Sequence, residues 1–158
     1  MSLSDELYRE TILDHYHNPR NQGVLEGASI LSVEGVNPLC GDELVLYLDV
    51  KDGKVEGISI KSRGCSINTA SSSMMTEAVK GQPLKRVHEM IDTFKDMMLS
   101  KTDDNVVPEE FEDLEALQGV RKYPVRIKCA LLPWNTLLEG LHSAESGQAA
   151  KPVSTEKD

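Results

Sequence analysis

The sequence predicts an α+β fold in which a small three-stranded antiparallel sheet packs against helices. Apolar and polar residues alternate in three runs between residues 28 and 62, which is the two-residue period of strands. From residue 66 onward the apolar residues recur every three to four positions, which is the period of helices. Strands followed by helices, rather than alternating with them, favour the α+β class over a parallel sheet.

Residues 3–17 are the first predicted element, an amphipathic helix. The apolar side chains in this segment keep helical spacing, at Leu3, Leu7, Tyr8, Ile12 and Tyr16. Asn18-Pro19 ends the helix because proline disfavours helical backbone in the residue before it. The apolar face is therefore expected to lie on the core.

Residues 28–36, 43–51 and 55–62 are the three predicted strands. The alternation is clearest in the second run, where one face carries Leu44, Leu46, Leu48 and Val50. Asp52-Gly53 separates the second run from the third, and this residue pair tolerates the positive φ angles of a tight hairpin turn. An antiparallel meander is the expected arrangement.

Two helices are predicted over residues 66–80 and 83–100. Gly81 suits the end of the first helix and Pro83 the start of the second. Residues 101–118 then contain a strongly acidic stretch at 103–115, with helical spacing only after Pro108. We expect a solvated loop and a short amphipathic helix in this region.

Trp134, Leu137, Leu138 and Leu141 mark the last predicted helix. Pro133 fits best in the first turn, because a proline deeper inside a helix removes a backbone hydrogen bond. If the helix begins earlier, we expect a kink at this proline. We expect residues 1–142 to form one domain and the polar residues 143–158 to form a disordered tail.

The charge balance excludes several classes of function. The chain has 26 acidic and 17 basic residues and a net charge of −9, so it lacks the basic surface that neutralises nucleic-acid phosphates. No stretch approaches the roughly 18 apolar residues of a membrane span, and the polar start Met1–Glu6 lacks the features of a secretory signal. We expect a cytoplasmic protein that binds neither nucleic acid nor membrane.

Cys40, Cys65 and Cys129 are the candidate chemical groups. No CxxC pair is present, so three separate buried thiols are the simplest interpretation. However, each cysteine is predicted to lie at a junction between elements, with Cys129 just ahead of the last helix. The hairpin around Asp52-Gly53 brings Cys40, Asp42 and Cys65 to one edge of the sheet.

These residues have the chemistry of a zinc site. Cys40, Asp42, Cys65 and Cys129 together would suit tetrahedral Zn²⁺, with the carboxylate as the more exchangeable ligand. Only tertiary folding can bring Cys129 to the other three.

Two basic residues, Lys128 and Arg126, lie close to Cys129 in the sequence and could act on the thiols. Lys128 directly precedes Cys129, where a cation favours the thiolate, and Arg126 could act similarly or bind a carboxylate of a partner. A structural salt bridge is an equally good interpretation of Arg126. His15 and His17 point in different directions on their helix, and we expect solvent or capping contacts for both.

The chain resembles the U-type iron-sulfur cluster assembly proteins, in particular the SufU branch. The resemblance runs from about Leu7 to Leu141. Four separate motifs carry it in order: Asp14-His15-Tyr16-His17-Asn18-Pro19-Arg20-Asn21, Asn37-Pro38-Leu39-Cys40-Gly41-Asp42, Gly64-Cys65-Ser66-Ile67-Asn68-Thr69-Ala70-Ser71-Ser72-Ser73-Met74-Met75, and Arg126-Ile127-Lys128-Cys129.

Two departures distinguish the chain from the IscU-type scaffolds. Those proteins carry a Leu-Pro-Pro-Val-Lys chaperone motif followed by His-Cys, and here the corresponding residues 121–129 contain neither the motif nor the histidine. The extra segment typical of SufU is expected within residues 101–120. The resemblance thus implies a compact α+β domain of the SufU type.

The resemblance also implies a function. SufU-like proteins are zinc-dependent sulfur acceptors that take persulfide sulfur from a SufS-type cysteine desulfurase and pass it to downstream iron-sulfur assembly proteins. Cys40 would be the acceptor, whereas Asp42, Cys65 and Cys129 would hold zinc. If the chain is an enzyme, it is then a zinc-dependent sulfurtransferase. The alternative is a scaffold on which a transient [2Fe–2S] cluster is built and delivered.

Overall fold

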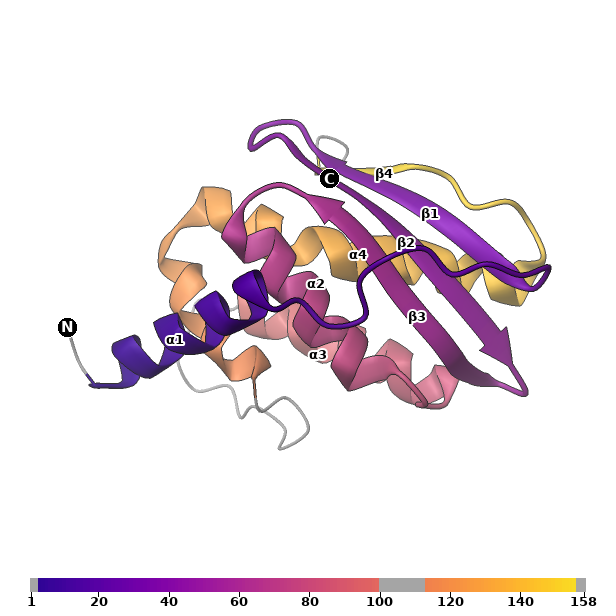
Figure 1. Cartoon of the computed structure of the whole chain (residues 1–158), viewed down its shortest axis with the longest axis horizontal. Helices are drawn as coiled ribbons and strands as arrows, with labels where there is room; N and C mark the ends of the chain where they lie inside the picture. Colours follow the sequence, from indigo (N-terminus) through magenta and orange to yellow (C-terminus); the bar gives the residue numbers. More distant parts are fainter. Residues whose placement is uncertain (1–2, 100–112, 156–158) are drawn as a thin grey trace.

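A computed structural model of the chain describes residues 3–99 and 113–155 (Figure 1). The elements follow the order α1 (Leu3–His17), β1 (Ile30–Asn37), β2 (Asp42–Lys51), β3 (Lys54–Arg63), α2 (Ser66–Val79), α3 (Leu84–Leu99), the 3₁₀ helix η2 (Leu114–Lys122), α4 (Pro124–Ser146) and β4 (Val153–Ser154). Strands come first and helices follow, as the α+β prediction requires.

The sheet has the strand order β3-β2-β1-β4. β2 pairs antiparallel with both β1 and β3, so the predicted meander is confirmed. Asp52 and Gly53 both adopt positive φ angles, 53° and 70°, in the turn between β2 and β3. The alternating leucines of β2, from Leu44 to Leu48, are buried. The expectation of three strands is wrong in one detail, because β4 adds a short parallel strand beside β1.

The helices α2 and α4 contact the sheet, and α3 packs against α4 (Figure 1). Phe94 of α3 stacks on Trp134 of α4 with ring centroids 4.4 Å apart. The indole Nε1–H of Trp134 donates to Ser71 Oγ of α2 at 3.2 Å, so this ring links three helices. Burial of both aromatic rings makes this the main helical part of the core.

The last helix starts earlier than predicted. α4 begins at Pro124, which occupies the first turn, and Pro133 lies inside the helix. An interior proline costs about 3 kcal/mol in helix propensity, yet every residue from Cys129 to Trp134 is buried. Tertiary packing outweighs the local cost. Consequently Cys129 lies within the helix rather than ahead of it.

The C-terminal residues also differ from the expectation of a disordered tail after residue 142. α4 continues to Ser146, and Gly147 ends it in the left-handed conformation. Val153 and Ser154 then pair with Gly35 and Val36 of β1. None of the described helices combines the length and apolar character needed to cross a lipid bilayer.

Candidate metal centre of three cysteines and an aspartate

Three segments of the chain bring the candidate ligands together. Cys40 and Asp42 lie in the tight connection between β1 and β2, where Asn37 and Asp42 are paired across the hairpin. Cys65 follows β3 and caps α2, and Cys129 lies in α4. The antiparallel register of β2 and β3 therefore places Cys40, Asp42 and Cys65 at one sheet edge, and α4 adds Cys129.

The distances define a compact cluster. The donor atoms of Cys40, Asp42 and Cys129 all lie within 4.8 Å of one another. The Sγ atoms of Cys40 and Cys129 are 3.4 Å apart. The Sγ atom of Cys65 is 3.8 Å from Asp42 Oδ2. All three cysteines are free thiols. The tertiary fold thus joins residues that are up to 89 positions apart in the sequence.

Asp42 is held in place by hydrogen bonds and by close packing. Its side chain is almost completely buried, at 1% exposure. Its Oδ1 accepts the backbone N–H of Cys65 at 2.8 Å, and its Oδ2 accepts the Asn37 amide at 3.3 Å. The carboxylate sits directly against Gly64, where a Cβ atom would overlap both Asp42 Oδ1 and its Cα. Glycine at position 64 therefore allows the carboxylate to reach the thiols.

Asn37 links the ligands to the C-terminal segment. Its buried Nδ2 donates to Asp42 Oδ2 and also to Cys129 Sγ, the latter at 3.4 Å. Its Oδ1 accepts the hydroxyl of Thr155 at 3.0 Å. Sequence reasoning did not assign a role to Asn37, Gly64 or Thr155. The turn signal of Asn37-Pro38 marks the first of them, whereas no local pattern marks Thr155.

The pKa values of Cys65 and Cys129 are shifted in opposite directions. The pKa of Cys65 is lowered to about 6, chiefly because the Cys129 thiol donates a hydrogen bond to it, with a smaller contribution from the Asn68 N–H. The same hydrogen bond, together with burial, raises the pKa of Cys129. The helix start favours the Cys65 thiolate, because Asn68 N–H lies 3.4 Å from its sulfur, but Cys129 has the larger effect on the Cys65 pKa.

Arg126 is the cation that interacts with these thiols. It is exposed in the first turn of α4, and the negative charge of Cys65 raises its pKa, followed by that of Cys129. Lys128 is half-buried one residue before Cys129. Positive charge is thus available at the exposed side of the cluster.

The residues present fit a zinc ion. Three thiols and one carboxylate form a donor set that matches tetrahedral zinc. A carboxylate as buried as Asp42 is costly unless a cation or hydrogen bonds compensate its charge. Two hydrogen bonds to Asp42 leave its other lone pairs free to bind a metal.

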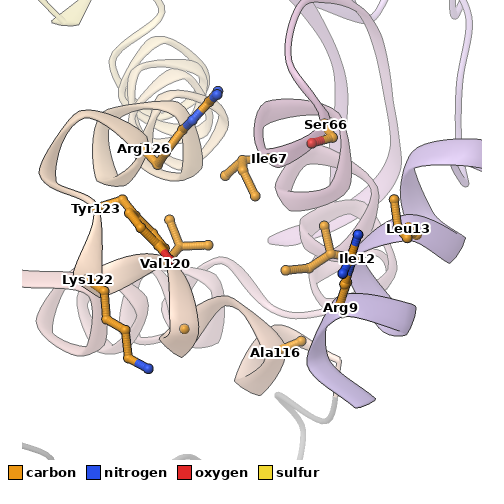
Figure 2. Close-up of a pocket in the computed structure, with 11 residues that line it drawn as sticks. Arg9, Ile12, Leu13, Ser66, Ile67, Ala116, Val120, Lys122, Tyr123 and Arg126 are labelled. Carbon is orange, nitrogen blue, oxygen red and sulfur yellow. The ribbon is translucent and has the colours of Figure 1, made fainter. Parts of the chain in front are cut away.

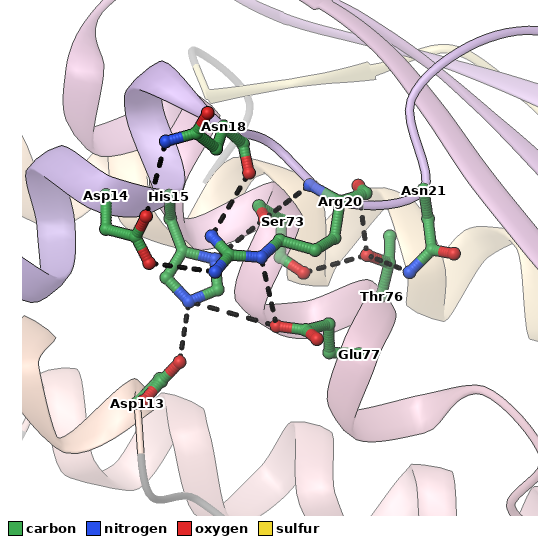
Figure 3. Close-up of polar contacts among 9 residues, drawn as sticks. All are labelled: Asp14, His15, Asn18, Arg20, Asn21, Ser73, Thr76, Glu77 and Asp113. Carbon is green, nitrogen blue, oxygen red and sulfur yellow. Dashed lines mark hydrogen bonds and ion pairs between the residues drawn. The ribbon is translucent and has the colours of Figure 1, made fainter.

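A second polar cluster contains His15, contrary to the expected solvent or capping contact (Figure 3). His15 is fully buried. Its Nδ1 is 2.7 Å from Ser73 Oγ and its Nε2 is 2.6 Å from Asp113 Oδ2. The Arg20 N–H donates to the same Ser73 hydroxyl at 2.9 Å. His15 therefore ties α1 to α2 and to the residue that precedes η2.

His15, Glu77 and Asp113 could in principle hold a metal ion, since their donor atoms lie within 4.8 Å of one another. However, the Arg20 guanidinium lies 3.8 Å from Glu77 and 2.8 Å from Asp14. Arg20 therefore already pairs with Glu77, and His15 with Asp113, so we assign the cluster a structural role.

Comparison with known proteins places the chain in a family. Residues 7–130 match the family of the NifU-like N terminal domain. The "Zinc-dependent sulfurtransferase SufU" of Bacillus subtilis is 44% identical over 143 residues, which cover 90% of this chain and 95% of that protein. The "Iron-sulfur cluster assembly scaffold protein IscU" of Streptococcus pyogenes is 36% identical over 148 residues, which cover 94% and 91% of the two chains.

Solved structures show the same fold. The N-terminal part of a NifU-like protein from Brucella abortus superposes with a TM-score of 0.76 at 26% identity, covering 92% of this chain and 99% of that one. FiSufU from Fervidobacterium islandicum superposes with a TM-score of 0.69 at 31% identity, covering 85% and 96%. The predicted α+β fold of the U-type assembly proteins is thereby confirmed.

Proposed function

The chain belongs to the family of NifU-like N-terminal domains, and from this premise we propose that it is a zinc-dependent sulfur acceptor in iron-sulfur cluster assembly. It takes persulfide sulfur from a SufS-type cysteine desulfurase and passes it to downstream assembly proteins. The observation that carries the proposal is the convergence of Cys40, Asp42 and Cys129 within 4.8 Å, with Cys65 beside them. The 44% identity to a zinc-dependent sulfurtransferase supports it.

Cys40, Asp42, Cys65 and Cys129 are the proposed zinc ligands. Bound zinc would keep the thiols deprotonated at neutral pH while it holds them together. Asn37 orients Asp42 and Cys129 by hydrogen bonds from one amide group. Hydrogen bonds of this kind, made to the ligands rather than to the metal, fix ligand geometry and raise affinity.

Cys40 is the proposed sulfur acceptor because it is less buried than Cys129 and, unlike Cys65, lies in a turn and caps no helix. It lies in the turn between β1 and β2 beside Leu39, whose side chain is 67% exposed, whereas Cys129 is buried inside α4. Cys65 is half-buried and its sulfur also accepts the Asn68 N–H as a helix cap. A persulfide carried on a partner would therefore reach Cys40 first.

The transfer step is a thiol exchange. The Cys40 thiolate attacks the outer sulfur of the partner's persulfide and forms a new S–S bond. The bond between the two persulfide sulfurs breaks, and its electron pair leaves with the partner's cysteine as a thiolate. Cys40 then carries the persulfide, and the net oxidation state of the two proteins together is unchanged.

Arg126 and Lys128 are proposed to assist at the exposed side of the cluster. Arg126 presents its guanidinium beside the thiols, where it can attract the negative charge of an incoming persulfide or bind a carboxylate of the partner. Lys128 adds a second positive charge to the same turn of α4.

The test measures alanine production by a SufS-type cysteine desulfurase with excess thiol reductant. We expect the zinc-loaded chain, added at sub-stoichiometric amounts, to stimulate alanine production over many turnovers. The Cys40→Ala variant should abolish stimulation, whereas Lys85→Ala, an exposed residue of α3, should stimulate like the unmodified chain. Stimulation by Cys40→Ala at the unmodified rate would refute the assignment of the acceptor.

A scaffold function is the second candidate. The 36% identity to an IscU scaffold protein over most of both chains favours it, and thiolates with one carboxylate also suit a labile [2Fe–2S] cluster. The test is reconstitution of the zinc-free chain with iron and sulfide, followed by transfer to an apo-ferredoxin. Stoichiometric cluster transfer would support the scaffold, and failure to form any cluster would exclude it.

A cytoplasmic location completes the proposal. Sulfur acceptance requires reduced thiols, and the three free cysteines are consistent with a reducing compartment. The location is testable by fractionating cells that produce the chain and measuring its thiol oxidation state in each fraction.

A further inference from the structure

A pocket of about 580 Å³ opens between α1, η2 and the first turns of α2 and α4 (Figure 2). Its apolar lining includes Ile12, Ile67 and Val120, which come from three different helices and point toward one another in Figure 2. Tyr123 stands at its edge, with 61% of its surface exposed. Apolar pockets of this size with an exposed aromatic residue are typical of binding sites.

Among the described residues that line this pocket, every charged one is basic. Of the described residues that line it, Arg9, Lys122 and Arg126 are basic and none is acidic. No described carboxylate forms an ion pair with any of the three. On a chain with a net charge of −9, these three basic side chains form a local positive patch among the described residues around the pocket. Such a patch attracts a negatively charged ligand.

The pocket borders the candidate metal centre, although none of the four candidate ligands lines it. Ser66, which lines the pocket, directly follows Cys65 in the chain. Arg126 lines the pocket and also interacts with the Cys65 and Cys129 thiols. A ligand bound in the pocket would therefore lie beside the thiols.

We propose that this pocket docks an acidic segment of a protein partner, anchored by a bulky apolar side chain. The partner is the protein that exchanges sulfur with Cys40, so this inference rests on the proposed function. The apolar anchor would pack on Ile12, Ile67 and Val120, and flanking carboxylates would pair with Arg9 and Lys122. A peptide fits better than a small anion, because the cations surround an apolar lining rather than converge on one point.

The first test uses peptide probes and does not depend on sulfur transfer. The zinc-loaded chain, labelled at Ile and Val methyl groups, is titrated by NMR with a peptide of alternating Glu and Leu residues. We expect the Ile12, Ile67 and Val120 methyl signals to shift at about 1 mM peptide, a concentration suited to weak binding. A peptide with Lys in place of Glu should leave the signals unchanged.

Charge reversals supply matched controls. Lys122→Glu and Arg9→Glu should each weaken peptide binding roughly threefold or more, the range expected when an exposed ion pair becomes repulsive. Lys85→Glu should bind the peptide like the unmodified chain. Lys85 follows Leu84, whose N–H bonds to Gly53 O in the β2–β3 turn. This turn lies at the opposite end of the strands from the thiols.

The outcomes separate this inference from the proposed function. Absent methyl shifts, or shifts produced equally by sodium glutamate at matched carboxylate concentration, would overturn docking of a peptide segment and leave the role of Cys40 intact. With the desulfurase as partner, Lys122→Glu should raise the KM for the chain without lowering kcat. An unchanged KM relative to Lys85→Glu would also overturn the inference.

Discussion

Thr155 and Asn37 are 118 positions apart in the sequence, and the hydroxyl of Thr155 donates to Asn37 Oδ1 at 3.0 Å. Both side chains are buried. The opposite end of the same amide donates to Asp42 and Cys129. The C-terminal segment therefore fixes which way the Asn37 amide faces, and through it the geometry of two proposed zinc ligands.

Thr155→Val should weaken zinc binding without unfolding the chain. Valine keeps the size of threonine but removes the hydroxyl that holds the Asn37 amide. A variant without the Asn37 side-chain amide should lose zinc affinity about tenfold or more, the range for residues that orient ligands. Thr155→Val should lower zinc affinity by a smaller factor. Competition with a chromophoric chelator measures both. Thr93→Val is the control, because it removes a hydroxyl bonded to Glu89 O on α3. Equal zinc affinity in this control, in Thr155→Val and in the variant without the Asn37 amide would contradict the idea that Thr155 acts on the zinc ligands through Asn37.

Gly64→Ala should impair the metal centre for a steric reason. The added Cβ would overlap the Asp42 carboxylate and displace it from the thiols. We expect a loss of zinc affinity together with a loss of stability of about 1–3 kcal/mol, as in other overpacked sites. Gly81→Ala is the matched control, since Gly81 has φ +83° but open space around its Cβ position. That variant should lose stability through backbone strain alone, and a comparable loss of zinc affinity in it would argue against the steric explanation.

His15→Ala should destabilise the fold without abolishing zinc binding. The substitution leaves a cavity in a fully buried position and removes the imidazole from Ser73 and Asp113. We expect a decrease of about 2–4 kcal/mol in the free energy of unfolding, measured in urea. His17→Ala changes an exposed residue of the same helix and should alter stability by no more than about 0.5 kcal/mol. Equal effects of the two variants would refute the structural role of His15.

Zinc removal should lower the melting temperature substantially. Ligands from three segments are joined only in the folded chain, so zinc binding stabilises the folded state. With free zinc at about 1,000 times Kd the stabilisation is about 4 kcal/mol, which corresponds to roughly 8–16 °C for a chain of this size. Differential scanning calorimetry with and without a chelator measures the shift. Asp42→Asn keeps the side-chain shape and should make the difference in melting temperature with and without chelator smaller. A melting temperature that the chelator does not change would show that zinc has no stabilising role.

Local patterns predicted the sheet and the position of Cys65 well. The alternating leucines of β2 and the Asp52-Gly53 turn act over a few residues, so their structural consequence is visible in the sequence. Cys65 follows Gly64 at the point where the spacing of apolar residues changes from that of a strand to that of a helix, and it caps α2. The contact of Asp42 with Cys65 likewise follows from the hairpin.

Long-range packing decided the features that local patterns missed. Pro133 suggested a helix start, yet burial of the neighbouring residues keeps α4 helical from Pro124. His15 lies three positions after Ile12, on the inward side of α1, but its polar character suggested an exposed position. β4 contains only Val153 and Ser154, too few residues for a recognisable period. Its position depends on pairing with β1.

The outer edges of β3 and β1 are each covered in part by a short segment of the same chain. Residues 21–23 bond to Ile60 on the outer side of β3, and β4 pairs with the outer side of β1 at Gly35 and Val36. Unpaired strand edges are templates for aggregation and domain swapping. Removing β4 would free the backbone groups of Gly35 and Val36 for intermolecular strand addition, so we expect a variant without β4 to self-associate more readily at high concentration.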